Sequence, residues 1–268
     1  MISSRALWSP IPLHCAWPAL LLVTFAFLQQ PAVAQPSSGE PLSTPVLLSV
    51  EKVVANLVRM NSQRAQALRS YQGLRTYRVE YRGFPSSRSA ERVVAITYHA
   101  PGTKEFTIES ATGSKLIIEK VFKKALQSEK EALETENQER TALNNDNYIF
   151  RMVGYEALSG NARYVLAVEP RTNSKFLYRG TIWVDAADFA VTRIEAQPAK
   201  NPSFWIKNTE IEQIYSKVNN FWLPAHNHSV TAIRLGGHAD FTIDYGSYQI
   251  TDAAQLNDSS NDRVKSQR

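Results

Sequence analysis

Seven segments with the residue alternation of β-strands follow one another through the second half of the chain, and only a few residues separate each from the next. A crossover between parallel strands needs a dozen or more residues, so these segments are expected to pair as consecutive antiparallel strands. The connection at Gly236-Gly237 has the composition of a two-residue hairpin turn. The predicted strands are Tyr148–Leu158, Ala162–Pro170, Leu177–Asp185, Ala190–Gln197, Lys207–Val218, Phe221–Leu235 and His238–Ile250.

The first half of the chain contributes helices and further strands. A proline after Thr44 and valines at three- and four-residue spacing predict an amphipathic helix that runs to about Tyr71. Its outer face carries Arg59, Arg64 and Arg69, which we interpret as a solvated surface. A second helix, rich in charge, is predicted over Glu119–Arg140. Strand patterns cover Tyr77–Arg82, Ala90–Tyr98, Lys104–Ser110 and a short fourth segment, Lys115–Ile118.

Together these patterns predict a mostly β fold of the α+β kind. About eleven strands form one antiparallel sheet, and a sheet of that length must curl or close. We expect a curved, unclosed half-barrel with a long N-terminal helix and an inserted helix that cover its concave face. No internal repeat divides the chain, so residues 44–250 are expected to form one domain.

The N-terminus has the features of a secretory signal peptide over residues 1–34. Arg5 precedes an apolar stretch from Ala19 to Leu28, and Ala32-Val33-Ala34 is a small-x-small cleavage site. We therefore expect an exported, periplasmic protein, with a flexible linker over residues 35–43 and a polar tail over residues 251–268. Cys15 is the only cysteine, so the mature chain must be stabilised by core packing without disulfides.

Several function classes are disfavoured. The chain has 268 residues with 30 Lys plus Arg and 25 Asp plus Glu, a net charge of +5, and no basic run that would indicate nucleic-acid binding. The sequence lacks a Gly-x-Ser-x-Gly elbow, a phosphate-binding loop and a dinucleotide fingerprint, so we expect neither an enzyme nor a cofactor. A hairpin at 236–237 would keep His226 and His228 away from His238, so no metal site is expected.

The aromatic and aliphatic strand faces point to a binding function. One predicted strand places Tyr164, Leu166 and Val168 on one face, and the next places Tyr178, Ile182 and Val184 together. Two helices leave part of such a concave face uncovered, so we expect a cavity for a lipid or acyl chain. Candidate cavity residues are these six with Tyr77, Val79, Tyr81, Val94 and Ile96; candidate lid or rim residues are Val54, Leu57, Phe122, Phe204, Trp205 and Trp222.

Several short motifs occur in an order that is similar to one known family. Tyr178–Asp185 reads Tyr-Arg-Gly-Thr-Ile-Trp-Val-Asp, and it is followed by Val191-Thr-Arg-Ile-Glu, by Pro198–Trp205 and by Phe221-Trp-Leu-Pro224. Tyr77–Phe84 and Tyr98-His-Ala-Pro-Gly102 precede them. From Val46 to Ile250 the chain resembles bacterial outer-membrane lipoprotein-sorting proteins of the LolA/LolB-like type.

The resemblance implies an unclosed antiparallel half-barrel, capped by helices, with an apolar cavity for acyl chains. It implies a monomeric periplasmic carrier of lipoproteins or lipids, with an envelope transporter or acceptor protein as a possible partner. The alternative is a lipid-sensing regulatory module of the same fold that binds a protein partner. The best-known carriers of the family have an arginine before a proline that helps to hold the lid closed; the matching dipeptide here is Ala100-Pro101.

The cleavage site gives a first testable prediction. When the full chain is expressed in a bacterium with a periplasm, the exported protein should begin at Gln35, because signal peptidase cuts after small-x-small sequences such as Ala32-Val33-Ala34. Intact-mass measurement of the periplasmic fraction checks this. A mass matching residues 1–268 in the membrane fraction would contradict it.

Overall fold

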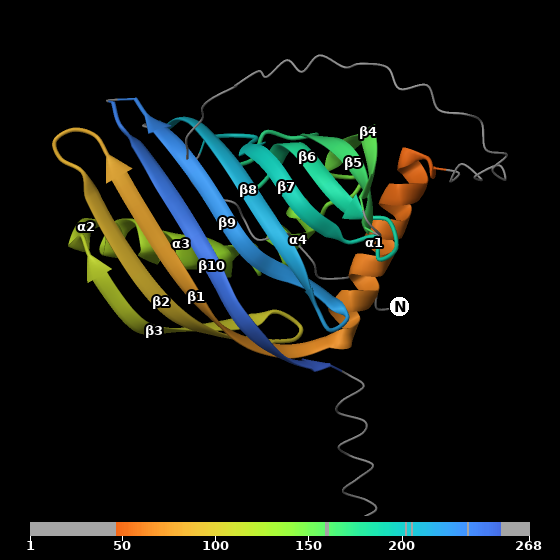
Figure 1. The fold of residues 1–268 in the computed structure, drawn as a ribbon, viewed down its shortest axis with the longest axis horizontal. Coiled ribbons are helices and arrows are strands. Elements are labelled where there is room, and N and C mark those ends of the chain that lie inside the picture. Colours follow the sequence, from red (N-terminus) through yellow and green to blue (C-terminus); the bar gives the residue numbers. More distant parts are fainter. Residues whose placement is uncertain (1–46, 159–160, 202, 205, 235, 253–268) are drawn as a thin grey trace, which may run out of the picture.

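The computed structural model describes residues 47–158, 161–201, 203–204, 206–234 and 236–252. The predicted signal peptide, linker and tail therefore lie outside the described residues. Within them, all strands belong to one ten-stranded antiparallel sheet (Figure 1). Its strands are β1 Leu68–Arg82, β2 Arg88–His99, β3 Thr103–Gly113, β4 Tyr148–Leu158, β5 Asn161–Pro170, β6 Tyr178–Asp185, β7 Val191–Pro198, β8 Ile206–Val218, β9 Phe221–Ile233 and β10 His238–Asp252.

The sheet consists of two meanders joined by one long-range pairing. Its order is β3-β2-β1-β10-β9-β8-β7-β6-β5-β4, so the last strand, β10, returns to pair with the first, as in Thr76↔Asp244. β3 and β4 are the two edges, and the sheet does not close. The segment between β3 and β4 therefore leads from one edge of the sheet to the other, and it contains the inserted helices.

Two helical elements cover the inner face of the sheet. α1, Val50–Ala67, begins at Ser49, whose side chain accepts a hydrogen bond from the backbone of Lys52 at 3.4 Å. The insertion consists of α2 Lys115–Ile117, the π-helix η1 Ile118–Phe122, α3 Lys123–Ala132 and α4 Thr135–Thr141. Figure 1 shows α1 beside the β4 end of the sheet and α2 and α3 behind β1 and β2.

Each helical element has its own hydrophobic core. The α1 core joins helix α1 to β4–β7 and comprises Val53, Val54, Leu57, Leu143, Tyr148, Phe150, Tyr164, Leu166, Val168, Leu177, Tyr178, Ile182, Val184, Ile194, Ala196 and Ala199. The insertion core joins the insertion to β1, β2, β9 and β10 and comprises Leu68, Tyr71, Tyr77, Val79, Ala90, Val94, Ile96, Ile117, Phe122, Phe221, Leu223 and Phe241.

The sheet and its helical cover confirm the predicted fold class, and the strands from β2 onward begin and end within three residues of their predicted limits. The prediction of a fourth strand at Lys115–Ile118 was wrong, so the described chain has ten strands. Gly113, with φ of +91°, turns the chain away from the sheet edge, and Ile118 N then donates to Ser114 O at 3.0 Å. The helix that follows is also shorter than predicted, since it breaks between α3 and α4 at Leu133 and Glu134.

Long-range strand pairing overrides the expected end of the first helix. The helix stops at Ala67, four residues before its predicted end at Tyr71, and β1 starts at the next residue, Leu68. Tyr71 pairs with Ile250 of β10 and is buried in the insertion core. Pairing with the far end of the chain, which no local pattern reveals, ends the helix.

The hairpin between β9 and β10 is longer than predicted. β9 ends at Ile233 and β10 begins at His238, and Gly236 N donates to Ile233 O at 3.0 Å. His238 therefore pairs with Ala232 rather than with Leu235. The shift leaves His226 and His228 far from His238 along the ladder, paired with Asp244 and Thr242.

Close packing under α1 gives a second prediction. Leu166 has an exposed fraction of 0 %, so Leu166→Trp should overpack the α1 core and lower the free energy of unfolding by roughly 1–3 kcal/mol. Val153→Trp on the edge strand β4, where the native side chain is 56 % exposed, is the control and should change it little. Denaturant unfolding measures both. An unchanged midpoint for Leu166→Trp would mean that the core has spare room.

Candidate functional site

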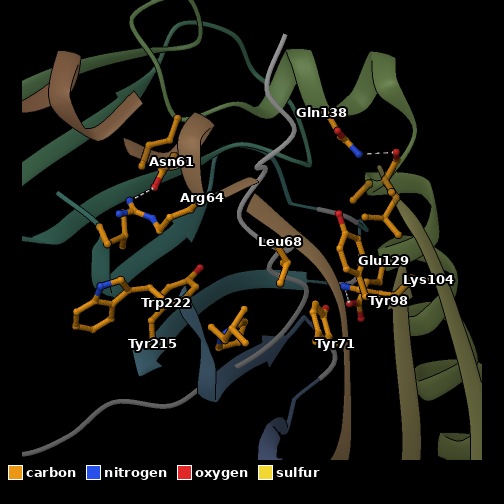
Figure 2. Close-up of a pocket in the computed structure, with 18 of the residues that line it drawn as sticks. Asn61, Arg64, Leu68, Tyr71, Tyr98, Lys104, Glu129, Gln138, Tyr215 and Trp222 are labelled. Carbon is orange, nitrogen blue, oxygen red and sulfur yellow. Dashed lines mark hydrogen bonds and ion pairs between the residues drawn. The ribbon is translucent and has the colours of Figure 1, made fainter. Parts of the chain in front are cut away.

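A cavity of about 130 Å³ lies between the two cores. Its walls come from the C-terminal half of α1, the start of β1, the β2–β3 turn, the insertion and β7–β9 (Figure 2). Apolar side chains line much of it, among them Leu68, Tyr71, Leu143, Ile194, Tyr215, Trp222 and Leu223. The rings of Tyr71 and Tyr98 stack there with centroids 5.1 Å apart. The lining suits an alkyl group better than a strongly polar molecule.

Most of the predicted cavity and lid residues do not line this space but are packed in the two cores on either side of it. Tyr164, Leu166, Val168, Tyr178, Ile182, Val184, Val54 and Leu57 are in the α1 core, and Tyr77, Val79, Val94, Ile96 and Phe122 are in the insertion core. Among the described residues, Trp222 is the one predicted rim residue that lines the cavity. Contact of these residues with a lipid stays a prediction.

Two other predicted site residues lie away from the cavity. Tyr81 is at the far end of β1, where its hydroxyl donates to the carbonyl oxygen of Phe84 at 2.7 Å. Phe204 is 73 % exposed in the β7–β8 connection. Trp205 lies outside the described residues.

A buried ionic cluster forms one wall of the cavity. Glu129 of α3 accepts bonds from Arg75 Nη1 at 2.9 and 2.8 Å and from Lys104 Nζ at 2.5 Å. The three side chains have exposed fractions of 8 %, 1 % and 6 %. Lys104 and Glu129 face the cavity beside Tyr98 (Figure 2). We call Arg75, Lys104 and Glu129 the ionic cluster; it ties the insertion to β1 and β3.

Charge pairing governs the protonation of this cluster. Burial acts to raise the pKa of Glu129, but the positive charges of Arg75 and Lys104 outweigh it and lower the pKa from 4.5 to about 2. Burial acts to lower the pKa of Lys104, and the charge of Glu129 raises it above its ordinary value instead. All three groups are therefore charged at neutral pH.

The opposite wall of the cavity is held by an arginine of α1. Arg64 Nη1 donates to the carbonyl oxygen of Asp188 at 2.8 Å, and Nη2 donates to that of Phe189 at 3.1 Å. Asp185 Oδ1 shapes this β6–β7 turn by accepting from the backbone of Asp188 at 2.7 Å. We call the contact of Arg64 with these two carbonyls the Arg64 latch. The interpretation of Arg64 as part of a solvated face was wrong, because α1 lies against the β6–β7 turn.

Sequence reasoning missed the ionic cluster, although one signal was available. Arg75 precedes Tyr77 and Val79 at the same two-residue spacing, so strand alternation places all three on the inner face. An arginine on an otherwise apolar inner face needs a buried partner. The helix pattern gave no indication that Glu129, among many acidic residues of the insertion, would supply it.

The two histidines of β9 lie beside aspartates of β10. His226 Nδ1 lies 2.7 Å from Asp244 Oδ1, and His228 Nε2 lies 3.5 Å from Asp240 Oδ1. Across the part of the chain that the structure describes, no group of three or more His, Cys, Asp or Glu side chains is placed to hold a metal ion. In the same residues, no helix combines the length and the apolar character needed to cross a membrane.

No protein-family model and no curated protein matches the sequence. Solved structures that match include a DUF1329 family protein from Desulfovibrio piger, with 14% identity, 75% of this chain and 92% of that chain covered, and a TM-score of 0.38. A domain named as an outer membrane lipoprotein-sorting protein from Vibrio parahaemolyticus has 12% identity, 80% and 99% coverage, and a TM-score of 0.37. A LolA superfamily protein from Nitrosomonas europaea has 12% identity, 77% and 95% coverage, and a TM-score of 0.35.

The matching structures thus include the group that the sequence motifs resemble. In these three structures the identities are 14% or lower and the TM-scores do not exceed 0.38, so they carry no evidence about the function of this chain.

The ionic cluster gives a third prediction. Glu129→Gln leaves Arg75 and Lys104 buried without a countercharge, so it should lower the free energy of unfolding at pH 7 by about 3–5 kcal/mol. Glu129 has a lowered pKa in the folded state, so its stabilisation is present above pH 4.5 and is lost as the pH falls toward 2. The difference between wild type and variant should therefore shrink by roughly 2 kcal/mol between pH 5 and pH 3.

Urea unfolding across this pH range measures the difference. Glu136→Gln, whose carboxylate pairs with Arg140 and is 71 % exposed, is the matched control and should have a small effect at every pH. A Glu129→Gln difference that does not change with pH would contradict the assigned charge state.

Proposed function

We propose that this protein is a non-catalytic periplasmic carrier that holds the acyl chain of a lipoprotein or lipid between its curved sheet and its helices during outer-membrane lipoprotein sorting. The observation that carries the proposal is an open sheet whose inner face is covered by two separately anchored helical elements, with an apolar-lined cavity at their junction. Either helical element can move away from the sheet without breaking strand pairing, because neither contributes a strand.

The size of the cavity supports a closed state that opens for its ligand. Small-molecule sites usually have volumes of roughly 300–1,000 Å³. The cavity of about 130 Å³ is smaller, so an acyl chain needs space that only movement of a helix creates. α1 is the element suited to move. Only three residues of α1 are buried, Val53, Val54 and Leu57. The helix is continuous with the sheet through Leu68, the first residue of β1.

Movement of α1 would uncover the residues that the sequence assigned to the cavity. Leu166, Ile182 and Val184 lie in the α1 core together with the buried side chains of the helix. An acyl chain that replaces α1 there buries the same apolar surface, at about 25 cal/mol per Å². The free energy released by acyl binding would thereby offset the free energy needed to move α1 off the sheet.

The Arg64 latch gives a fourth prediction. Hydrogen bonds to charged groups contribute about 1.5–3 kcal/mol, so Arg64→Ala should loosen α1 and speed uptake of a fluorescent acyl probe by roughly tenfold or more. Arg59→Ala is the matched control, because Arg59 bonds only to the neighbouring Asn56 among the described residues. Stopped-flow fluorescence measures the uptake rate. Failure of the wild-type protein to bind any acyl probe would refute the carrier proposal.

One observation favours the alternative, a lipid-sensing module with a protein partner. β3 is an edge of the sheet, and its residues from Thr107 to Gly113 are exposed. An exposed edge strand is a surface to which an extended segment of another protein can add. Native mass spectrometry of the protein taken from its own envelope separates the two: a carrier retains an acyl-bearing species, whereas a sensor also retains a protein partner.

A further inference from the structure

The buried charges beside the cavity do not balance. Arg75 and Lys104 are both positive, and Glu129 is the one carboxylate that bonds to them among the described residues. Tyrosine side chains also surround them: Arg75 Nη1 donates to the Tyr77 hydroxyl at 3.5 Å, and the rings of Tyr245 and Tyr71 lie 4.8 Å from Arg75 Cζ and 6.0 Å from Lys104 Nζ. Rings attract a cation but do not neutralise it. The ionic cluster therefore has one excess positive charge in a setting that water barely reaches.

Some hydrogen-bond donors of the ionic cluster have no acceptor among the described residues. Nε and Nη2 of Arg75 are buried and have no hydrogen-bond partner among the described residues. The Lys104 ammonium has three N–H donors, and the bond to Glu129 uses one of them. Buried donors without partners destabilise a fold, and an acceptor atom of a ligand beside them would remove that cost.

The charge across the cavity has the same sign. Arg64 lines the facing wall, and its guanidinium bonds to the backbone carbonyls of Asp188 and Phe189. The Asp188 carboxylate is occupied by Lys217 Nζ at 2.6 Å and Trp222 Nε1 at 2.8 Å. The cavity is thus bordered by Lys104, Arg64 and Glu129, which sum to one positive charge (Figure 2).

We infer that the ligand of this cavity is an amphiphile with a single anionic headgroup, a carboxylate or a phosphate ester, which binds beside Lys104 while its alkyl chain extends along the apolar lining toward the α1 core. The inference rests on the proposed function, because it assigns a headgroup to the acyl ligand proposed above. An anion there receives charge-assisted hydrogen bonds from Lys104 and neutralises the excess charge. A cationic head would add to that charge and bind poorly.

The test compares four ligands that share a dodecyl chain: dodecanoate, dodecyl phosphate, dodecanol and dodecyltrimethylammonium. Each displaces an uncharged fluorescent acyl probe from the full-length mature protein at concentrations below micelle formation. We expect the two anions to bind about tenfold more tightly than dodecanol, equal to about 1.4 kcal/mol, and the cation to bind more weakly than dodecanol. The stronger of the two anions identifies whether the head is a carboxylate or a phosphate.

Lys104→Met tests the assigned residue, because it removes the excess charge and leaves Glu129 paired with Arg75. The anion preference should disappear while dodecanol binding is retained. Lys207→Met, which removes an exposed lysine of β8, should keep the preference. If Lys104→Met does not fold, Lys104→Gln, which retains a donor, replaces it, and the wild-type series still decides on the charge of the head.

The failures are distinguishable. Equal affinity of the wild-type protein for all four ligands would overturn the headgroup inference and leave the carrier proposal standing. An anion preference that survives Lys104→Met would overturn the assignment to Lys104. If no dodecyl ligand displaces the probe, and the probe itself does not bind, both the carrier proposal and the inference built on it are refuted.

Discussion

The buried carboxylate of Glu129 is the interaction on which the arrangement of the cover depends. It joins α3 to Arg75 of β1 and Lys104 of β3, and so it fixes the insertion at one edge of an open sheet. Burying three charges lowers stability unless they pair at good geometry, and removal of one partner leaves the others buried without a countercharge. The insertion is therefore held by interactions that are difficult to break singly.

The second element of the cover is held in a different way. α1 relies on a short apolar face and on the Arg64 latch, whose acceptors are backbone carbonyls rather than a carboxylate. An acyl chain can take the place of the apolar side chains that α1 packs on the sheet, whereas the buried charges of the ionic cluster have no such substitute. In the proposed carrier, the two attachments divide the cover into a fixed wall and a movable one, with the cavity between them.

Strand alternation and short connections made the sheet predictable. Their signals are local, because the side-chain period of two and the length of a turn are both read from neighbouring residues. The same alternation correctly grouped Tyr164, Leu166 and Val168 on the buried face with Ile182 and Val184. The candidate site was less predictable. Trp222 was identified as a rim residue, but Arg64, Lys104 and Glu129, which give the cavity its charge, were not.

The sequence by itself determined the antiparallel sheet, its inner face and the presence of two helical segments, because each depends on periodicity within one segment. Tertiary structure alone decided where α1 ends, since the pairing of β1 with β10 joins residues at opposite ends of the domain. It also decided which charges are buried. Arg75, Lys104 and Glu129 are 25 or more residues apart, and only the packing of the insertion against β1 and β3 brings them together. The residue type of a charged side chain does not show whether it is exposed or buried. Its ion-pair partner therefore cannot be inferred from the neighbouring residues in the sequence.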